Sequence, residues 1–174
     1  MSGGREVPRV PNYEDFTAPN NRSGLPMRIE AAGNSIVSRF RIPEYMAGWR
    51  TDTTVGAHPG AIATALVTVM GQGTFYRTKK AAWIKSLSVE YLGLVPVDHE
   101  LTCESNVMHQ RGNEEVVTEA TIVDGNGEVL ARASASYHLL DVTALGAPHS
   151  LISNRVACAP AFAAEFQRLA RTLP

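Results

Sequence analysis

The sequence predicts an α+β fold in which an antiparallel sheet wraps around one long central helix. Two observations lead to this prediction. Residues 60–74 contain no charged side chain and follow the segment His58-Pro59-Gly60, a combination typical of the start of a buried helix. Beyond this helix, segments of alternating apolar and polar residues are separated by glycine-rich turns, which indicates a meander of antiparallel strands.

The expected elements follow in a simple order. Two strands, separated by the turn signal Gly33-Asn34, precede an irregular stretch over 43–57. The helix is expected from about Pro59 to about Tyr76, with its apolar sides all buried. Glycines at 112, 125 and 127 mark hairpin turns in the part that follows. The strands are expected at 27–29, 36–42, 84–92, 100–110, 115–124 and 128–140.

Length and composition exclude several classes of protein. A chain of 174 residues with a net charge of −1 favours a single domain and has no basic stripe for nucleic acid. No apolar run reaches the length of about 18 residues that a membrane span needs. Cys103 and Cys158 are too few for a disulfide framework and match no zinc spacing. We therefore expect a cytoplasmic protein without nucleic-acid, membrane or metal partners.

The two ends of the chain differ from its centre. Residues 1–23 are expected to form a flexible N-terminal arm, and residues 24–142 the folded domain. Residues 143–174 are expected to form a C-terminal extension with a short amphipathic helix. That helix is expected from apolar residues at helical spacing: Phe162, Phe166, Leu169 and Leu173.

The start of the central helix is the first candidate site. The amides of Gly60 and Ala61 lie where a helix leaves its first N–H groups without intrahelical partners. Together with the helix dipole, free amides at this position favour a carbonyl oxygen or an anion.

The motifs resemble a known family. The strand pair opened by Gly24-Leu25-Pro26, the helix opened by His58-Pro59-Gly60, and the later segments 86–92 and 127–131 occur in a characteristic order. This order resembles that of hotdog-fold thioesterases, in particular the branch of phenylacetate-pathway acyl-CoA thioesterases. The resemblance covers roughly residues 24–140.

The resemblance implies an assembly and a ligand. It implies a homo-oligomer, either a dimer or a tetramer, in which two sheets join edge to edge and the active site lies between subunits. The substrate would be a small-molecule acyl thioester, with coenzyme A as part of the substrate and no separate cofactor. Gly60 and Ala61 would polarise the thioester carbonyl through their amides, and His58 would shape the loop.

The sequence departs from the family pattern at the hydrolytic residues. Hydrolytic members carry a carboxylate nine positions after the family histidine, where this chain has Val67, followed by Thr68. Ile84 falls where related enzymes often place a serine or threonine. The usual site for an activated water is therefore expected to be apolar.

Three hypotheses about function remain open. In the first, the protein hydrolyses an acyl thioester and uses a non-standard base, either Asp52 or His58. Asp52 could instead cap its loop among neighbouring threonines. In the second, it dehydrates, isomerises or cyclises a carbonyl-bearing acyl or polyketide-like substrate, with Tyr76, Thr68 and His58 as possible proton donors. In the third, it binds an acyl group without turnover.

The remaining candidates concern binding. Trp49 could form a wall of the acyl pocket or anchor the core, and Thr64, Val67, Ile84 and Tyr76 would line that pocket. The cluster Arg77-Thr78-Lys79-Lys80 could bind the phosphates of the coenzyme or could simply be a solvated helix end. Arg111 could contact the coenzyme or only form a hairpin turn.

Overall fold

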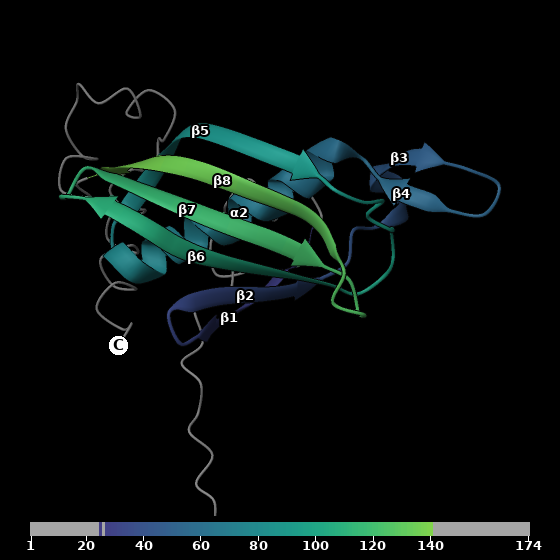
Figure 1. The fold of residues 1–174 in the computed structure, drawn as a ribbon, viewed down its shortest axis with the longest axis horizontal. Coiled ribbons are helices and arrows are strands. Elements are labelled where there is room, and N and C mark those ends of the chain that lie inside the picture. Colours follow the sequence, from purple (N-terminus) through teal and green to yellow (C-terminus); the bar gives the residue numbers. More distant parts are fainter. Residues whose placement is uncertain (1–24, 26, 141–174) are drawn as a thin grey trace, which may run out of the picture.

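The computed structural model describes residues 25 and 27–140. The expected arm over 1–23 and the expected C-terminal extension over 143–174 lie outside the described residues. One long helix and two sheets make up the described chain (Figure 1). In chain order, the elements are β1 (Met27–Ala32), β2 (Ser35–Phe40), the 3₁₀ helix η2 (Glu44–Met46), β3 (Ala47–Arg50), β4 (Val55–Ala57), α2 (Pro59–Thr78), β5 (Ala81–Tyr91), β6 (Leu101–Arg111), β7 (Glu115–Val123) and β8 (Val129–Leu140).

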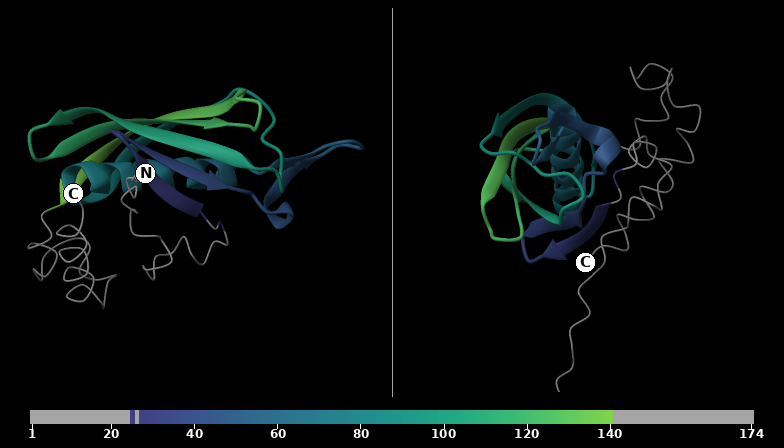
Figure 2. Two further views of the ribbon diagram at one scale, coloured as in Figure 1. Left: turned by 90° about the horizontal axis from the view of Figure 1, so that it is seen from below. Right: turned by 90° about the vertical axis from the view of Figure 1, so that its right-hand side faces the viewer.

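The larger sheet confirms the predicted fold class. Its six strands follow the order β1-β2-β6-β7-β8-β5, and every pair of neighbours is antiparallel. Seen from the end of the molecule, the sheet curves around α2, which lies against its inner face (Figure 2). Each predicted strand outside the stretch 43–57 has its counterpart in this sheet.

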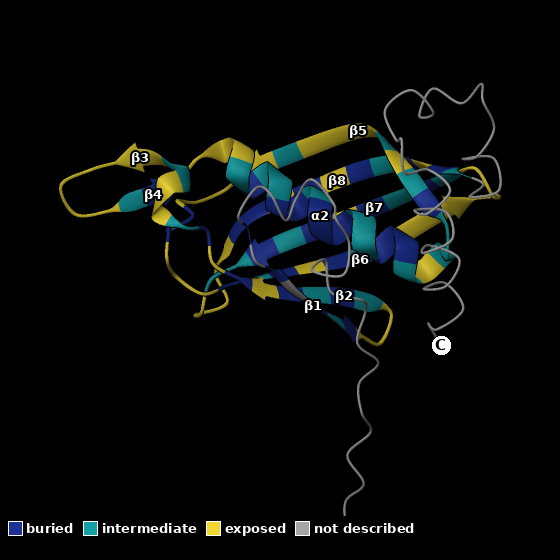
Figure 3. Ribbon diagram, turned by 180° about the vertical axis from the view of Figure 1, so that it is seen from behind, coloured by how far each residue is buried: buried dark blue, intermediate teal, exposed yellow. Residues whose placement is uncertain are grey.

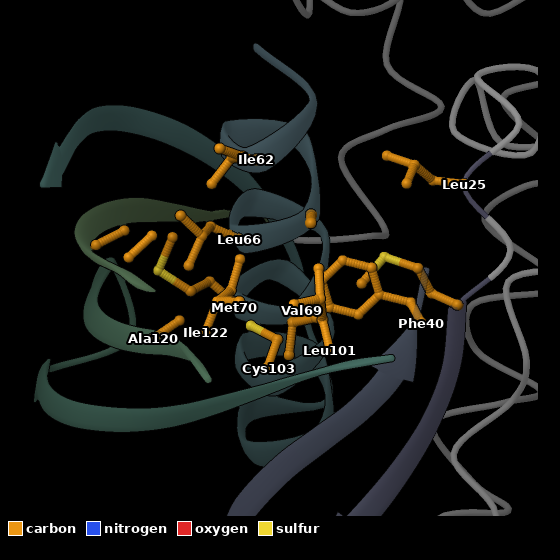
Figure 4. Close-up of a cluster of buried hydrophobic side chains, with 14 of the residues drawn as sticks. Leu25, Phe40, Ile62, Leu66, Val69, Met70, Leu101, Cys103, Ala120 and Ile122 are labelled. Atoms are coloured by element: carbon orange, nitrogen blue, oxygen red, sulfur yellow. The ribbon is translucent and has the colours of Figure 1, made fainter. Parts of the chain in front are cut away.

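The core lies between α2 and the inner face of the sheet (Figure 4). On α2, apolar residues three or four positions apart point toward the sheet. On the strands, every second residue points toward the helix, so the two sets of side chains form one core. The helix contributes Ile62, Leu66, Val69 and Met70, and the strands contribute Leu101, Cys103, Ala120 and Ile122.

The expectation that the helix is buried on every side is wrong. Along the flank of α2 nearest β8, the residues Ala63, Val67 and Gly71 are only half-buried. Tyr137 of β8 marks this flank, because its hydroxyl donates to the Val67 carbonyl oxygen at 3.2 Å. A sheet that curves around one face of a helix leaves such a flank open within a single copy of the domain.

Strand β5 forms an exposed edge of the sheet (Figure 3). It pairs with β8 on one side, and within residues 27–140 no strand pairs with its other side. Three large apolar side chains along it, Trp83, Leu87 and Tyr91, are exposed. An unpaired edge with exposed apolar residues is a favourable surface for another strand.

The stretch 43–57 is more regular than expected. It forms a hairpin of β3 and β4 that projects from the body of the molecule (Figures 1 and 2). Ala47 pairs with Ala57 at the base, and Arg50 pairs with Val55 near the tip. Strands of four and three residues are too short for alternation to show in the sequence.

Candidate functional site at the start of the central helix

Two backbone hydrogen bonds fix the entry into α2. Ala57 N–H donates to the Val95 carbonyl at 2.8 Å, and His58 N–H donates to the Met46 carbonyl at 2.7 Å. The chain thus enters the helix between the base of the hairpin and the segment that follows β5. His58, Pro59 and Gly60 are nevertheless all exposed, so the helix start is open to solvent.

The first amides of α2 are not free, contrary to expectation. His58 is the N-cap residue, and its Nδ1 accepts the Gly60 N–H at 2.9 Å. Ala61 N–H donates to the His58 carbonyl oxygen at 2.9 Å. The physical reason is that orphan donors at a helix start take the nearest acceptor, here the preceding histidine.

The cap fixes the state of the His58 ring. Because Nδ1 accepts a hydrogen bond, the proton of the neutral imidazole lies on Nε2. His58 therefore offers an N–H donor on an exposed ring, and its Nδ1 occupies the position where an acceptor oxygen would meet the Gly60 amide.

Two glycines allow this arrangement. A Cβ on Gly48 of β3 would lie 2.6 Å from the His58 Cα, so the hairpin packs directly against the cap residue. A Cβ on Gly60 would lie 3.0 Å from His58 Nδ1. The Gly48 contact could not be read from the sequence, because it depends on how the hairpin folds back.

Two hydroxyl groups bind the carbonyls of the first turn. The Tyr91 hydroxyl, at the end of β5, donates to the Pro59 carbonyl at 3.2 Å. The Thr64 hydroxyl donates to the Gly60 carbonyl at 2.8 Å. Thr64 is among the residues expected from the sequence to line the pocket. Tyr91 is not among them, although its place on the inner face follows from the alternation of β5.

Trp49 lies near this entry but does not anchor the core. Its side chain is 63% exposed, which rules out the alternative of an aromatic core residue. A Cβ on Gly56 would lie 2.7 Å from Leu94 Cδ1 and 3.5 Å from Trp49 Cβ. Trp49 and the exposed Leu94 therefore flank the hairpin base close to the helix start.

The middle of α2 is apolar. Val67 and Ile84 both lie beside Tyr137, which pairs with Ile84 in the sheet and binds the Val67 carbonyl. Thr68 is buried, and its hydroxyl donates to the Thr64 carbonyl at 2.7 Å. No Asp or Glu occurs between Pro59 and Thr78, so the helix itself supplies no carboxylate.

Asp52 lies in the turn of the hairpin, exposed and away from His58. The end of the turn and the three residues of β4 separate it from His58. The Thr51 hydroxyl makes the hydrogen bonds of this turn, accepting the Thr54 N–H at 3.0 Å. Within one protomer, the structure therefore does not bring Asp52 to the helix start.

The predicted coenzyme-binding residues lie at the other end of the molecule. The end of α2 holds Arg77, Lys79 and Lys80. It also holds Tyr76, which was expected in the acyl pocket, and Lys79 Nζ lies 4.9 Å from the centre of the Tyr76 ring. A helix of twenty residues is about 30 Å long, which separates these cations from Gly60 of the same chain. Arg111 ends β6 at this same end of the sheet, where β6 turns into β7 (Figure 1).

Other classes of site find little support in the described part of the chain. Across residues 27–140, no three His, Cys, Asp or Glu side chains come together in a way that could hold a metal ion. Burial first, and then the charge of Glu104, raises the pKa of the Cys103 thiol well above its ordinary value. Such a thiol is not a nucleophile.

No described helix has both the length and the apolar character needed to cross a membrane.

Comparison with known proteins identifies the fold. No protein-family model and no curated protein matches the sequence. Among solved structures, a thioesterase-superfamily protein is similar at a TM-score of 0.60 and 22% identity, over 71% of this chain and 90% of its own. The E. coli PaaI protein, from the phenylacetic acid degradation operon, is similar at a TM-score of 0.61 and 17% identity, over 74% of this chain and 88% of its own.

A third similar structure contains a ligand. A Streptococcus mutans UA159 protein bound to acetyl-CoA is similar at a TM-score of 0.58 and 16% identity, over 66% of this chain and 88% of its own. The described chain therefore has the hotdog fold that these thioesterase-superfamily proteins share.

Proposed function

We propose that this protein binds an acyl thioester, such as an acyl-CoA, with the thioester carbonyl at the start of α2. The observation that carries the proposal is the hydrogen bond from Gly60 N–H to the exposed His58 ring at 2.9 Å. That amide lies at the positive end of a twenty-residue helix, and His58 Nδ1 holds the position of its acceptor. An acyl oxygen can take this position when the ring turns aside, or it can accept from His58 Nε2–H.

Hydrolysis of the thioester is the first reaction that we propose. Polarisation of the carbonyl at a helix start supports attack by water. Val67 cannot activate that water, so the base must come from elsewhere, and we propose Asp52. Because Asp52 lies at the hairpin tip, it would act at the helix start of another copy in a larger oligomer rather than at its own.

A second candidate is a non-hydrolytic reaction, namely dehydration, isomerisation or cyclisation of the acyl group. The apolar surroundings of Val67 and Ile84, and the absence of a carboxylate along α2, favour it. Polarising a carbonyl makes its α-proton more acidic without any need for water. Thr68 is a weaker proton donor in this scheme, since its hydroxyl already binds the Thr64 carbonyl.

We further propose that the working form is a homodimer or larger homo-oligomer in the cytoplasm. The exposed edge of β5 and its apolar side chains support self-association. The buried free thiol of Cys103 fits a reducing compartment.

The test is a panel of acyl-CoA esters of different chain length and polarity, followed by thiol release and by mass spectrometry of the acyl group. Release of thiol supports hydrolysis, and its loss in Asp52→Asn but not in the matched control Glu128→Gln assigns the base. An altered acyl group still joined to coenzyme A supports the second candidate. Binding without either change leaves an acyl-binding protein, and absence of binding contradicts the proposal.

A further inference from the structure

In the part of the chain that the structure describes, three side chains that can donate a proton make hydrogen bonds at the first turn of α2. The His58 ring accepts the Gly60 N–H through Nδ1, which leaves Nε2–H as its donor. The Thr64 hydroxyl donates to the Gly60 carbonyl at 2.8 Å. The Tyr91 hydroxyl reaches the turn from β5 and donates to the Pro59 carbonyl at 3.2 Å. The function proposed above makes no use of Tyr91.

The hydrogen bond of Tyr91 is the easiest of these for a ligand to replace. Its length of 3.2 Å is beyond the usual range for a hydroxyl donor and an oxygen acceptor. Pro59 is the first residue of α2, so its carbonyl oxygen also accepts the helical N–H four residues later. That oxygen therefore keeps a partner when the tyrosine turns to a ligand.

The Tyr91 side chain is also accessible. It is 48% exposed, and its partner across the sheet is Ala131, a small residue. Tyr76, which was expected to be a possible proton donor, lies sixteen residues after Gly60 on α2, about 24 Å away along the helix axis. Of these two tyrosines, only Tyr91 lies at the start of the helix.

Tyr91 and the Gly60 amide lie on opposite sides of one peptide group. The bond between Pro59 and Gly60 is trans, so the Pro59 carbonyl and the Gly60 N–H point in opposite directions. An oxygen that accepts the Gly60 N–H would lie about 5 Å from the Pro59 oxygen, which is the oxygen that Tyr91 contacts. The His58 ring lies on the Gly60 N–H side, because its Nδ1 accepts that N–H. One ligand oxygen therefore cannot bind both donors, whereas two oxygens several bonds apart can.

We propose that Tyr91 determines specificity by donating a hydrogen bond to a second oxygen of the ligand, on C3 or C4 of the acyl chain. The inference rests on the proposed function, because it needs the thioester oxygen at Gly60 or at His58 Nε2–H. It adds a substrate class, namely acyl thioesters with a hydroxyl or carbonyl group a few carbons beyond the thioester. A phenol donates one O–H and suits either kind of oxygen.

The experiment compares three ligands by isothermal titration calorimetry on the full chain: butyryl-CoA, 3-hydroxybutyryl-CoA and 4-hydroxybutyryl-CoA. Wild-type protein should bind one of the two hydroxylated esters about three- to tenfold more tightly than butyryl-CoA, as expected for one neutral hydrogen bond. Tyr91→Phe keeps the ring and removes the hydroxyl. It should lose this preference and bind butyryl-CoA with wild-type affinity. For an ester that is turned over, the same ratios are measured as kcat/KM.

The comparison separates recognition of the ligand from a structural role of Tyr91. If the hydroxyl only held the first turn of α2 in place, Tyr91→Phe would weaken the binding of all three esters by the same factor, and that result overturns the inference. The matched control is Tyr45→Phe, which removes the hydroxyl of another exposed tyrosine and should alter none of the three affinities.

Two results with the wild-type protein distinguish this inference from the proposed function. A protein that binds none of the three esters contradicts the proposed function, and the inference fails with it. A protein that binds butyryl-CoA at least as tightly as both hydroxylated esters contradicts only the role of Tyr91, and the proposal of an acyl-thioester site at the start of α2 stands.

Discussion

His58 shows how a single residue can both complete the fold and prepare a site. As N-cap, it satisfies the Gly60 amide through Nδ1 and the Ala61 amide through its carbonyl. The same contacts leave Nε2–H on an exposed ring. The sequence correctly indicated that His58 and Gly60 mark a helix start. It could not indicate that the histidine ring itself occupies the acceptor position.

Replacement of His58 tests its role as cap. His58→Ala removes the acceptor of the Gly60 amide and should lower the free energy of unfolding by about 1 kcal/mol, the usual value of an N-cap side chain. His58→Asn keeps a side-chain acceptor at the same position and should recover most of that loss. Urea denaturation of the three proteins measures the difference, and equal stability of the alanine and wild-type proteins would refute the cap.

The core contains buried hydroxyl groups that make no hydrogen bond in the described structure. Ser38, Ser105 and Thr118 lie on three consecutive strands of the inner face, and Thr74 lies on α2. A buried hydroxyl without a partner costs stability, because it has lost its hydrogen bonds to water.

Thr118→Val should therefore raise the free energy of unfolding, by about 1 kcal/mol, since valine has the same shape without the hydroxyl. Thr68→Val is the matched control, because the Thr68 hydroxyl does have an acceptor in the Thr64 carbonyl. The control should bring no gain in stability. Thermal and urea unfolding of both variants provide the measurement, and a clear loss of stability in Thr118→Val would contradict this account.

At the scale of elements, the hairpin of β3 and β4 positions the helix start. Met46 accepts the His58 N–H, and Gly48 lies directly against the His58 backbone. The hairpin is thus part of the frame of the candidate site, although its tip projects from the body (Figure 2).

Gly48→Ala tests this contact. Its Cβ would lie 2.6 Å from His58 Cα, a backbone atom that can move only with the helix start. We expect a loss of about 1–3 kcal/mol in the free energy of unfolding, as for other overpacked positions. Gly125→Ala makes the same change in open space and should be close to neutral. Similar stability of the two variants would show that the hairpin does not pack against His58.

Most elements could be predicted from the sequence, because their signals are local. The uncharged run 60–74 predicted α2. The alternation of apolar and polar residues, interrupted by glycines in turns, predicted the strands of the large sheet. Gly33, Gly112 and Gly127 do adopt positive φ values in their turns. The hairpin could not be predicted, since its short strands depend on contacts with Val95 and His58 rather than on their own pattern.

The candidate site was predictable only in part. The segment from His58 to Ala61 could be found because a proline and a glycine mark the start of a helix. The contact of Tyr91 with Pro59 joins residues far apart in the chain, and no local pattern reveals it. The placement of Asp52 and of the basic cluster relative to Gly60 likewise depends on the tertiary fold.

At the scale of the whole molecule, the domain is asymmetric. Its acceptor position lies at one end of α2, its basic cluster at the other, and an exposed strand edge connects them. One copy of the domain leaves a flank of the helix half-exposed, and it holds the predicted coenzyme-binding cations at the end of α2 opposite Gly60.

The central claim is that an acyl thioester binds with its carbonyl at the start of α2. The most direct test is a titration of the ¹⁵N-labelled full-length protein with acetyl-CoA, followed by amide chemical shifts in a two-dimensional NMR spectrum. We predict that Gly60 and Ala61 shift most, together with the imidazole resonances of His58. Saturable shifts elsewhere, with these three residues unchanged, would contradict the account.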